Sequence, residues 1–169
     1  IDDSDVIIME GIHSLNPQMT YMLDDSDKYK IYISPLNQLY INKAGQDPVK
    51  VSTIDSRLLR RMIRDYRTRG SDVERTISMW KSVRAGEEKY IFPYEKEADV
   101  MFNSGLLYEY TAIRSAASPL LAAVPEKSEY YDEARRLLDF MNMFCDIDTS
   151  YIPLNSIIRE FIGGGCFRI

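Results

Sequence analysis

The sequence is poor in the side chains that usually hold disulfides or metal ions. Its 169 residues include two cysteines, Cys145 and Cys166, and one histidine, His13. The cysteines do not form a C-x-x-C pair, and a single histidine cannot complete a zinc site with them, so we expect reduced thiols. A domain of this size buries about 70% of the surface that its unfolded chain exposes, so it needs no disulfide or metal ion for stability. A secreted disulfide scaffold is excluded.

Long hydrophobic runs are also missing. No stretch approaches the ~20 apolar residues that a membrane span requires, and no basic segment precedes an apolar one as in a signal peptide. We therefore expect a cytoplasmic protein with no membrane partner. The sequence begins at Ile1 and enters an apolar run at once, which suggests a cut through a larger protein.

Acidic residues outnumber basic ones, 26 against 21, but one segment is rich in arginine. The net charge of −5 argues against a general nucleic-acid binder. Residues 57–75 nevertheless hold seven arginines, three acidic residues and no lysine. Planar guanidinium groups favour bidentate contacts to phosphate or carboxylate, so this segment predicts a local anionic ligand. An RNA-binding interpretation has weaker support, because only one aromatic residue for base stacking, Tyr66, lies among the arginines.

Strand and helix patterns alternate along the chain, which predicts an α/β fold with a mainly parallel sheet. We expect strands at residues 5–10, 30–34 and 98–102, the first and last of them buried, and a short hairpin piece at residues 38–42. Three strands are few for such a sheet. Further strands upstream of the chain would complete it.

Helices are predicted where apolar residues recur at helical spacing. The first is capped by Thr53 or Asp55 and ends at Gly70, and its apolar face carries Leu58, Leu59, Met62 and Ile63. A capping box of Ser71 and Glu74 opens the second, which we expect to end at Gly86. Residues 106–113 fit a strand or a helix. Further helices are expected to begin at Ser118 and Ser128 and to cover residues 152–161.

Glu10 closes the apolar run of residues 5–9 in the way that an acidic residue closes a Walker B strand. A buried strand would fix this carboxylate where a magnesium nucleotide binds. A purely structural carboxylate at the end of a strand is the alternative.

Arg57, Arg61 and Arg64 lie on one face of the first predicted helix, and Arg69 follows near a turn. A lid that carries these arginines would stabilise charge on a transferred phosphoryl group and exclude water. The alternative is a solvated helix face on which Asp65 and Glu74 pair with neighbouring arginines.

Three segments together resemble the uridine kinase and phosphoribulokinase family of P-loop kinases. They are DVIIMEGIH at 5–13, RRMIRDYRTRG at 60–70 and ADVMF at 98–102, in the order and spacing of that family. The resemblance covers about the first 105 residues and implies an α/β, P-loop NTPase-like fold that is incomplete at its N-terminal side. Residues 1–125 would form the C-terminal part of the kinase domain, with a lid at about 57–75. Residues 126–169, which resemble the tail of bacterial uridine kinase-like proteins, would form a helical extension packed on it.

The resemblance also implies ATP and Mg²⁺ as cofactors and assigns roles to particular residues. Glu10 would organise magnesium through water and assist catalysis, and Arg64 and Arg69 would contact phosphate, with Arg61 as a further basic lid position. His13 is a candidate contact to the acceptor. A hydrogen-bonded structural histidine is the alternative for it.

Two departures from the family pattern concern the acceptor and the nucleotide. Ser71 and Met79 stand where uridine kinases place an arginine and a glutamine that contact the nucleoside, so the resemblance leaves the acceptor open among a different nucleoside, a sugar and a sugar phosphate. No G-x-x-x-x-G-K-[ST] motif occurs, so we expect this chain alone to be inactive. The intact protein would transfer the γ-phosphoryl group of ATP to a hydroxyl of a nucleoside or related sugar. The alternative is a non-catalytic binding or assembly module with a kinase-like fold, and a homo-oligomer is compatible with either.

Overall fold

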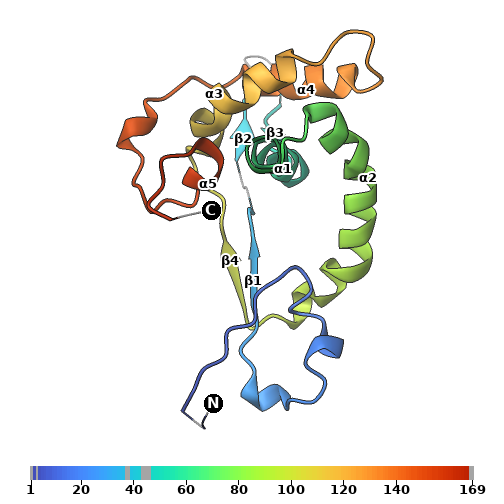
Figure 1. Ribbon diagram of the computed structural model, residues 1–169, viewed down its shortest axis with the longest axis vertical. Coiled ribbons are helices and arrows are strands. Elements are labelled where there is room, and N and C mark those ends of the chain that lie inside the picture. Colours follow the sequence, from blue (N-terminus) through green and yellow to red (C-terminus); the bar gives the residue numbers. More distant parts are fainter. Residues whose placement is uncertain (1, 3, 37–38, 43–46, 168–169) are drawn as a thin grey trace. The chain divides into compact units, whose positions relative to one another are not determined.

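The computed structural model describes residues 2, 4–36, 39–42 and 47–167. The chain divides into two compact units. The first unit comprises Ile1–Ser34 and Ser82–Phe102, and the second comprises Pro35–Lys81 and Asn103–Ile169. Helices and a small parallel sheet occur together (Figure 1), which confirms the predicted α/β class.

The first unit contains a two-stranded sheet formed by β1 (Ile31–Ser34) and β4 (Val100–Asn103). Just before the strands, the backbone N–H of Lys30 donates to the Asp99 carboxylate at 2.7 Å, and the Lys30 carbonyl accepts from the Asp99 N–H at 2.9 Å. The strands predicted at residues 30–34 and 98–102 are thus confirmed. The described residues of this unit also form the 3₁₀ helices η1 (Pro17–Met19), η2 (Asp25–Asp27) and η3 (Phe92–Glu97).

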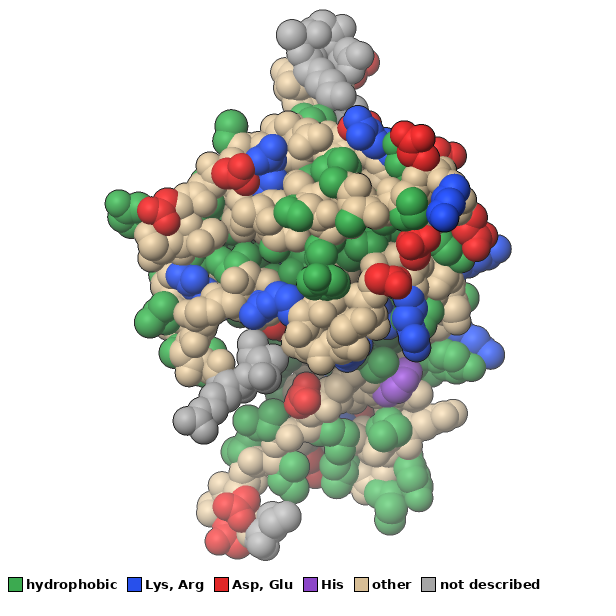
Figure 2. Space-filling model, turned by 45° about the horizontal axis from the view of Figure 1, so that its top comes forward, with side chains coloured by type: hydrophobic (Ala, Val, Ile, Leu, Met, Phe, Trp, Pro, Cys, Tyr) green, Lys and Arg blue, Asp and Glu red, His purple; other side chains and the backbone are tan. Residues whose placement is uncertain are grey.

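The buried strand predicted at residues 5–10 is wrong. These residues have no regular secondary structure, Val6 and Ile8 are each 87% exposed, and Glu10 is exposed as well. A strand needs a neighbour for its N–H and C=O groups, and in the described part of this unit only β1 and β4 pair. The burial expected for residues 98–102 is also wrong, because β4 has no exposed-to-buried alternation and Phe102 is 57% exposed. Hydrophobic side chains are visible at the surface in Figure 2.

Helix α1 (Thr53–Arg69) begins the helical part of the second unit. Its cap is Ser52, whose side chain accepts from the N–H groups of Ile54 and Asp55, and not Thr53 or Asp55 as predicted. Gly70 ends the helix with φ of +62°, a conformation that glycine adopts without strain. The predicted apolar face is confirmed, since Leu58, Leu59, Met62 and Ile63 are all buried.

Helix α2 (Val73–Tyr90) has residues in both units. Asp72 caps it by accepting the backbone N–H of Arg75 at 2.7 Å, so the capping box of Ser71 and Glu74 is wrong. Glu74 instead accepts from the Ser128 hydroxyl at 2.5 Å. The helix runs through Gly86, because one helical glycine costs only about 1 kcal/mol relative to alanine.

The later helices differ from the prediction mainly in their bounds. Helix α3 (Glu109–Ala122) shows residues 109–113 of the ambiguous segment to be helix and contains Ser118 and Pro119, where a separate start was expected. Helix α4 (Tyr131–Met141) confirms the helix predicted after Ser128. The predicted helix at 152–161 is replaced by α5 (Arg159–Ile162), which follows η4 (Thr149–Tyr151) and ends at Gly163.

The core of the second unit forms where α1, α3, α4 and α5 meet. Tyr110 of α3 is buried at its centre, stacked on Phe144 with 4.9 Å between the ring centroids, and its hydroxyl donates to Ser56 Oγ at 2.9 Å. A small antiparallel pair, β2 (Tyr40–Ile41) and β3 (Val49–Lys50), lies in the same unit. It confirms the hairpin piece, although Gln38 lies outside the described residues.

Candidate anion-binding pocket

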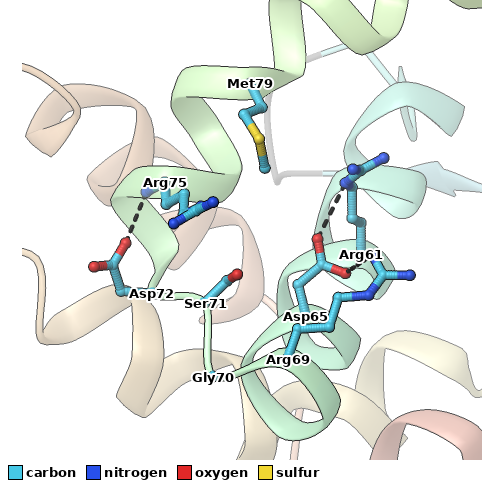
Figure 3. Close-up of a pocket in the computed structure, with 8 residues that line it drawn as sticks. All are labelled: Arg61, Asp65, Arg69, Gly70, Ser71, Asp72, Arg75 and Met79. Carbon is cyan, nitrogen blue, oxygen red and sulfur yellow. Dashed lines mark hydrogen bonds and ion pairs between the residues drawn. The ribbon is translucent and has the colours of Figure 1, made fainter.

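A polar pocket of about 390 Å³ lies in the second unit where α1 ends and α2 begins (Figure 3). Both helices and the turn between them contribute to its lining. The lining residues are Arg61, Asp65, Arg69, Gly70, Ser71, Asp72, Arg75 and Met79.

The spacing of residues along α1 brings one wall of the pocket together. Arg61, Asp65 and Arg69 are each four residues apart, so they share one helix face. The chain then reverses at Gly70, where the carbonyl of Asp65 accepts the N–H of Ser71 at 3.1 Å. Because of this tight turn, the first turns of α2 place Arg75 and Met79 across from that wall (Figure 3).

Asp65 is the centre of the charged network. It is 1% exposed, and its carboxylate accepts from Arg69 at 2.7 Å and from Arg61 Nε at 3.2 Å. Two guanidinium groups thus stabilise one buried carboxylate and are held in fixed directions by it. The pairing expected for Asp65 on a simple helix face is present, whereas Glu74 bonds to Ser128.

Arg64 does not line the pocket. Its NH1 lies 3.4 Å from Glu160 Oε1 on α5, and its Nε lies 4.0 Å from Asp65. Arg67, on the same helix, donates to the carbonyls of Glu160 and Phe161 at 2.9 and 2.7 Å. Two arginines of the basic segment therefore hold the C-terminal part of the chain.

The pocket thus brings together Arg61 and Arg69 from the predicted site. Glu10 and His13 belong to the first unit. His13 lies in a turn, with its ring edge-on to Tyr90 at 6.4 Å between centroids. The roles predicted for Glu10 at a metal and for His13 at an acceptor stay predictions.

Arg75 is the pocket residue that the sequence did not indicate as functional. In the sequence it is one of seven arginines in residues 57–75, and its position facing α1 depends on the turn at Gly70. Ser71 and Met79, singled out as departures from a family pattern, line this same pocket.

The described residues contain no group of three His, Cys, Asp or Glu side chains placed to hold a metal ion. Cys145 and Cys166 are exposed free cysteines, as expected. Among the helices of the described residues, none combines the length and apolar character needed to cross a membrane.

Comparison with known proteins supports the resemblance seen in the sequence. Residues 49–108 match the model of the Phosphoribulokinase / Uridine kinase family, a range that contains the whole pocket. Uridine kinases from two strains of Staphylococcus epidermidis are each 33% identical to the chain over 106 residues. These alignments cover 62% of this chain and 41% of each relative, so the chain spans less than half the length of these relatives. The comparison with solved structures found no match to this chain. The predicted family resemblance is thereby confirmed.

Proposed function

We propose that this chain carries the phosphate-binding lid of an ATP-dependent kinase, which transfers the γ-phosphoryl group to a hydroxyl of a nucleoside or related sugar in the cytoplasm. One observation carries the proposal. Arg61 and Arg69 are held by the buried Asp65 in a concave pocket, within the residues that match a kinase family.

Phosphoryl transfer needs positive charge more than it needs covalent chemistry from the protein. The bond from the γ-phosphorus to the leaving diphosphate oxygen breaks, and a bond to the acceptor oxygen forms while the hydroxyl loses its proton. Negative charge is spread over the equatorial oxygens during this step, and guanidinium donors stabilise it. Arg61 and Arg69 supply such donors.

Asp65 acts by positioning these donors before a phosphate arrives. Because the guanidinium groups are already directed by one carboxylate, less conformational freedom is lost on binding. Arg69 is the more accessible of the two, with 57% of its side chain exposed against 25% for Arg61. Of these two arginines, Arg69 is therefore the more available to an incoming phosphate.

The carboxylates of this pocket do not fit a magnesium ion. Asp65 is engaged by two guanidinium groups, and Asp72 accepts the backbone N–H of Arg75. The pocket therefore acts through its guanidinium groups and not through a metal ion.

The proposal is tested with the full reading frame that encodes this chain, in a coupled assay of ADP release over nucleosides, sugars and sugar phosphates. We expect acceptor-dependent ADP release that falls roughly tenfold or more in Arg69→Ala, since an ionic hydrogen bond to the transition state is lost. The exposed Arg135, which pairs with Asp139 on α4 at 3.4 Å, provides the control variant Arg135→Ala.

Arg64→Ala is the third variant of this set. The family resemblance implies that Arg64 contacts phosphate, whereas its ion pair with Glu160 indicates a structural role. Unchanged rates in Arg69→Ala and Arg64→Ala would remove the lid assignment. Phosphate binding without any ADP release would favour the binding module instead.

A further inference from the structure

The three guanidinium groups of the pocket differ in how their charge is balanced. Those of Arg61 and Arg69 share the carboxylate of Asp65. Within the part of the chain that the structure describes, the guanidinium of Arg75 has no hydrogen-bond or ion-pair partner. Its backbone N–H is bound by Asp72, whose carboxylate caps α2.

The direction of the Arg75 side chain matters as much as its free charge. It extends from the first turn of α2 into the pocket, on the side opposite the Asp65 network (Figure 3). Met79, four residues further along α2, lines the pocket with an apolar thioether that cannot balance this charge. On the α2 side of the pocket, the described residues therefore present a guanidinium that forms no ion pair, while the Asp72 carboxylate beside it is bound to the backbone.

The three arginines differ in what an incoming anion must displace in order to bind them. To bind Arg61 or Arg69, it must compete with a buried carboxylate that already accepts their hydrogen bonds. To bind Arg75, it displaces only water, and the planar fork of a guanidinium fits two oxygens of a phosphate at once. Arg75 is thus the group in this pocket that gains most from an anion.

We propose that Arg75 is a phosphate-binding residue of this pocket and its principal anchor for an anion. The inference rests on the proposed function for the identity of the phosphate, which belongs either to the triphosphate donor or to a phosphorylated acceptor. Both sources present the same oxyanion chemistry, and separate probes distinguish them.

The test measures dissociation constants of the 169-residue chain by calorimetric titration with inorganic triphosphate, with ribose 5-phosphate and with ribose. We expect Arg75→Gln to weaken binding of at least one phosphorylated probe roughly tenfold or more, because one charge-assisted contact is lost. Arg75→Lys, which keeps the charge but not the fork, should recover part of the affinity. Arg75 is exposed, so the fold should persist in both variants.

The control is Arg135→Gln, which removes an exposed arginine of α4. It should leave the dissociation constants of triphosphate and ribose 5-phosphate within about twofold of those of the unchanged chain. A loss confined to triphosphate assigns Arg75 to the donor, and a loss confined to ribose 5-phosphate assigns it to the acceptor. Unchanged binding of both probes in Arg75→Gln overturns the inference and leaves the proposed function standing on Arg61 and Arg69. If neither phosphorylated probe binds the unchanged chain, both this inference and the proposed function are overturned.

Discussion

The carboxylate of Asp65 accepts a hydrogen bond from Arg69, one helical turn further along α1, at 2.7 Å. The same carboxylate accepts from Arg61, one turn earlier. Asp65 is buried whereas Arg69 is largely exposed, so the pair joins the interior of α1 to the pocket surface. This relationship makes the network testable through stability as well as through binding.

Replacing the central carboxylate should destabilise the second unit. We expect Asp65→Asn to lower the free energy of unfolding by about 1–3 kcal/mol, because the charge that pairs two guanidinium groups is lost from a buried position. Urea denaturation followed by circular dichroism measures it. Asp139→Asn, which breaks the exposed pair with Arg135, should change the same quantity by less than about 1 kcal/mol. Equal effects of the two variants would contradict the network.

The buried pair of Arg60 and Glu109 ties α1 to the start of α3. Glu109 is fully buried, and its Oε2 accepts from Arg60 NH2 at 2.6 Å. Glu109→Gln leaves a nearly buried guanidinium without its counter-charge, so we expect a loss of about 3–5 kcal/mol in unfolding free energy. Glu88→Gln, at an exposed partner of Arg84, is the matched control. A loss below that of Glu88→Gln would refute this assignment.

Two glycines should respond to alanine with opposite signs. Gly70 has φ of +62°, so Gly70→Ala should destabilise the protein by about 1–2 kcal/mol through backbone strain. Gly86 lies inside α2 with open space around its added Cβ, so Gly86→Ala should stabilise by about 0.5–1 kcal/mol. Thermal unfolding of both variants measures the difference. Stabilisation by Gly70→Ala would show that the turn between α1 and α2 is not the one described.

Asp148 should titrate below an ordinary aspartate. The side chain and then the backbone N–H of Ser150 hydrogen-bond its carboxylate and lower its pKa from 3.8. Because the pKa is lower in the folded state, the contribution of this carboxylate to stability is present above the ordinary pKa of 3.8 and is lost as the pH falls through the folded pKa. NMR titration of the carboxyl carbon measures it, and Ser150→Ala should move the midpoint back toward 3.8. A midpoint above 3.8 in the unchanged chain would contradict the contact.

The sequence predicts those parts of the fold that depend on local periodicity. The apolar face of α1 follows from the spacing of Leu58, Leu59, Met62 and Ile63, and its end follows from Gly70. The run at residues 5–10 has the composition of a buried strand, but a strand forms only where a neighbour supplies hydrogen bonds, which the run itself cannot specify.

The candidate site could be predicted only in part for a similar reason. Arg61 and Arg69 share a helix face that spacing reveals, whereas Arg75 reaches the pocket only through the turn at Gly70. The spacing also places Arg64 on the helix face that carries Arg61, as expected for a lid residue. In the structure, however, Arg64 pairs with Glu160, which lies 96 residues away in the chain. Such long-range pairings are tertiary and leave no mark in local sequence.

The most direct test of the central claim is calorimetric titration of the chain with inorganic triphosphate, comparing the unchanged protein with Arg69→Gln and Arg135→Gln. The phosphate-binding account predicts measurable affinity that falls roughly five- to tenfold in Arg69→Gln, after allowance for solvent screening, and stays within about twofold in Arg135→Gln. Equal affinity in all three proteins, or none in the unchanged chain, would contradict it.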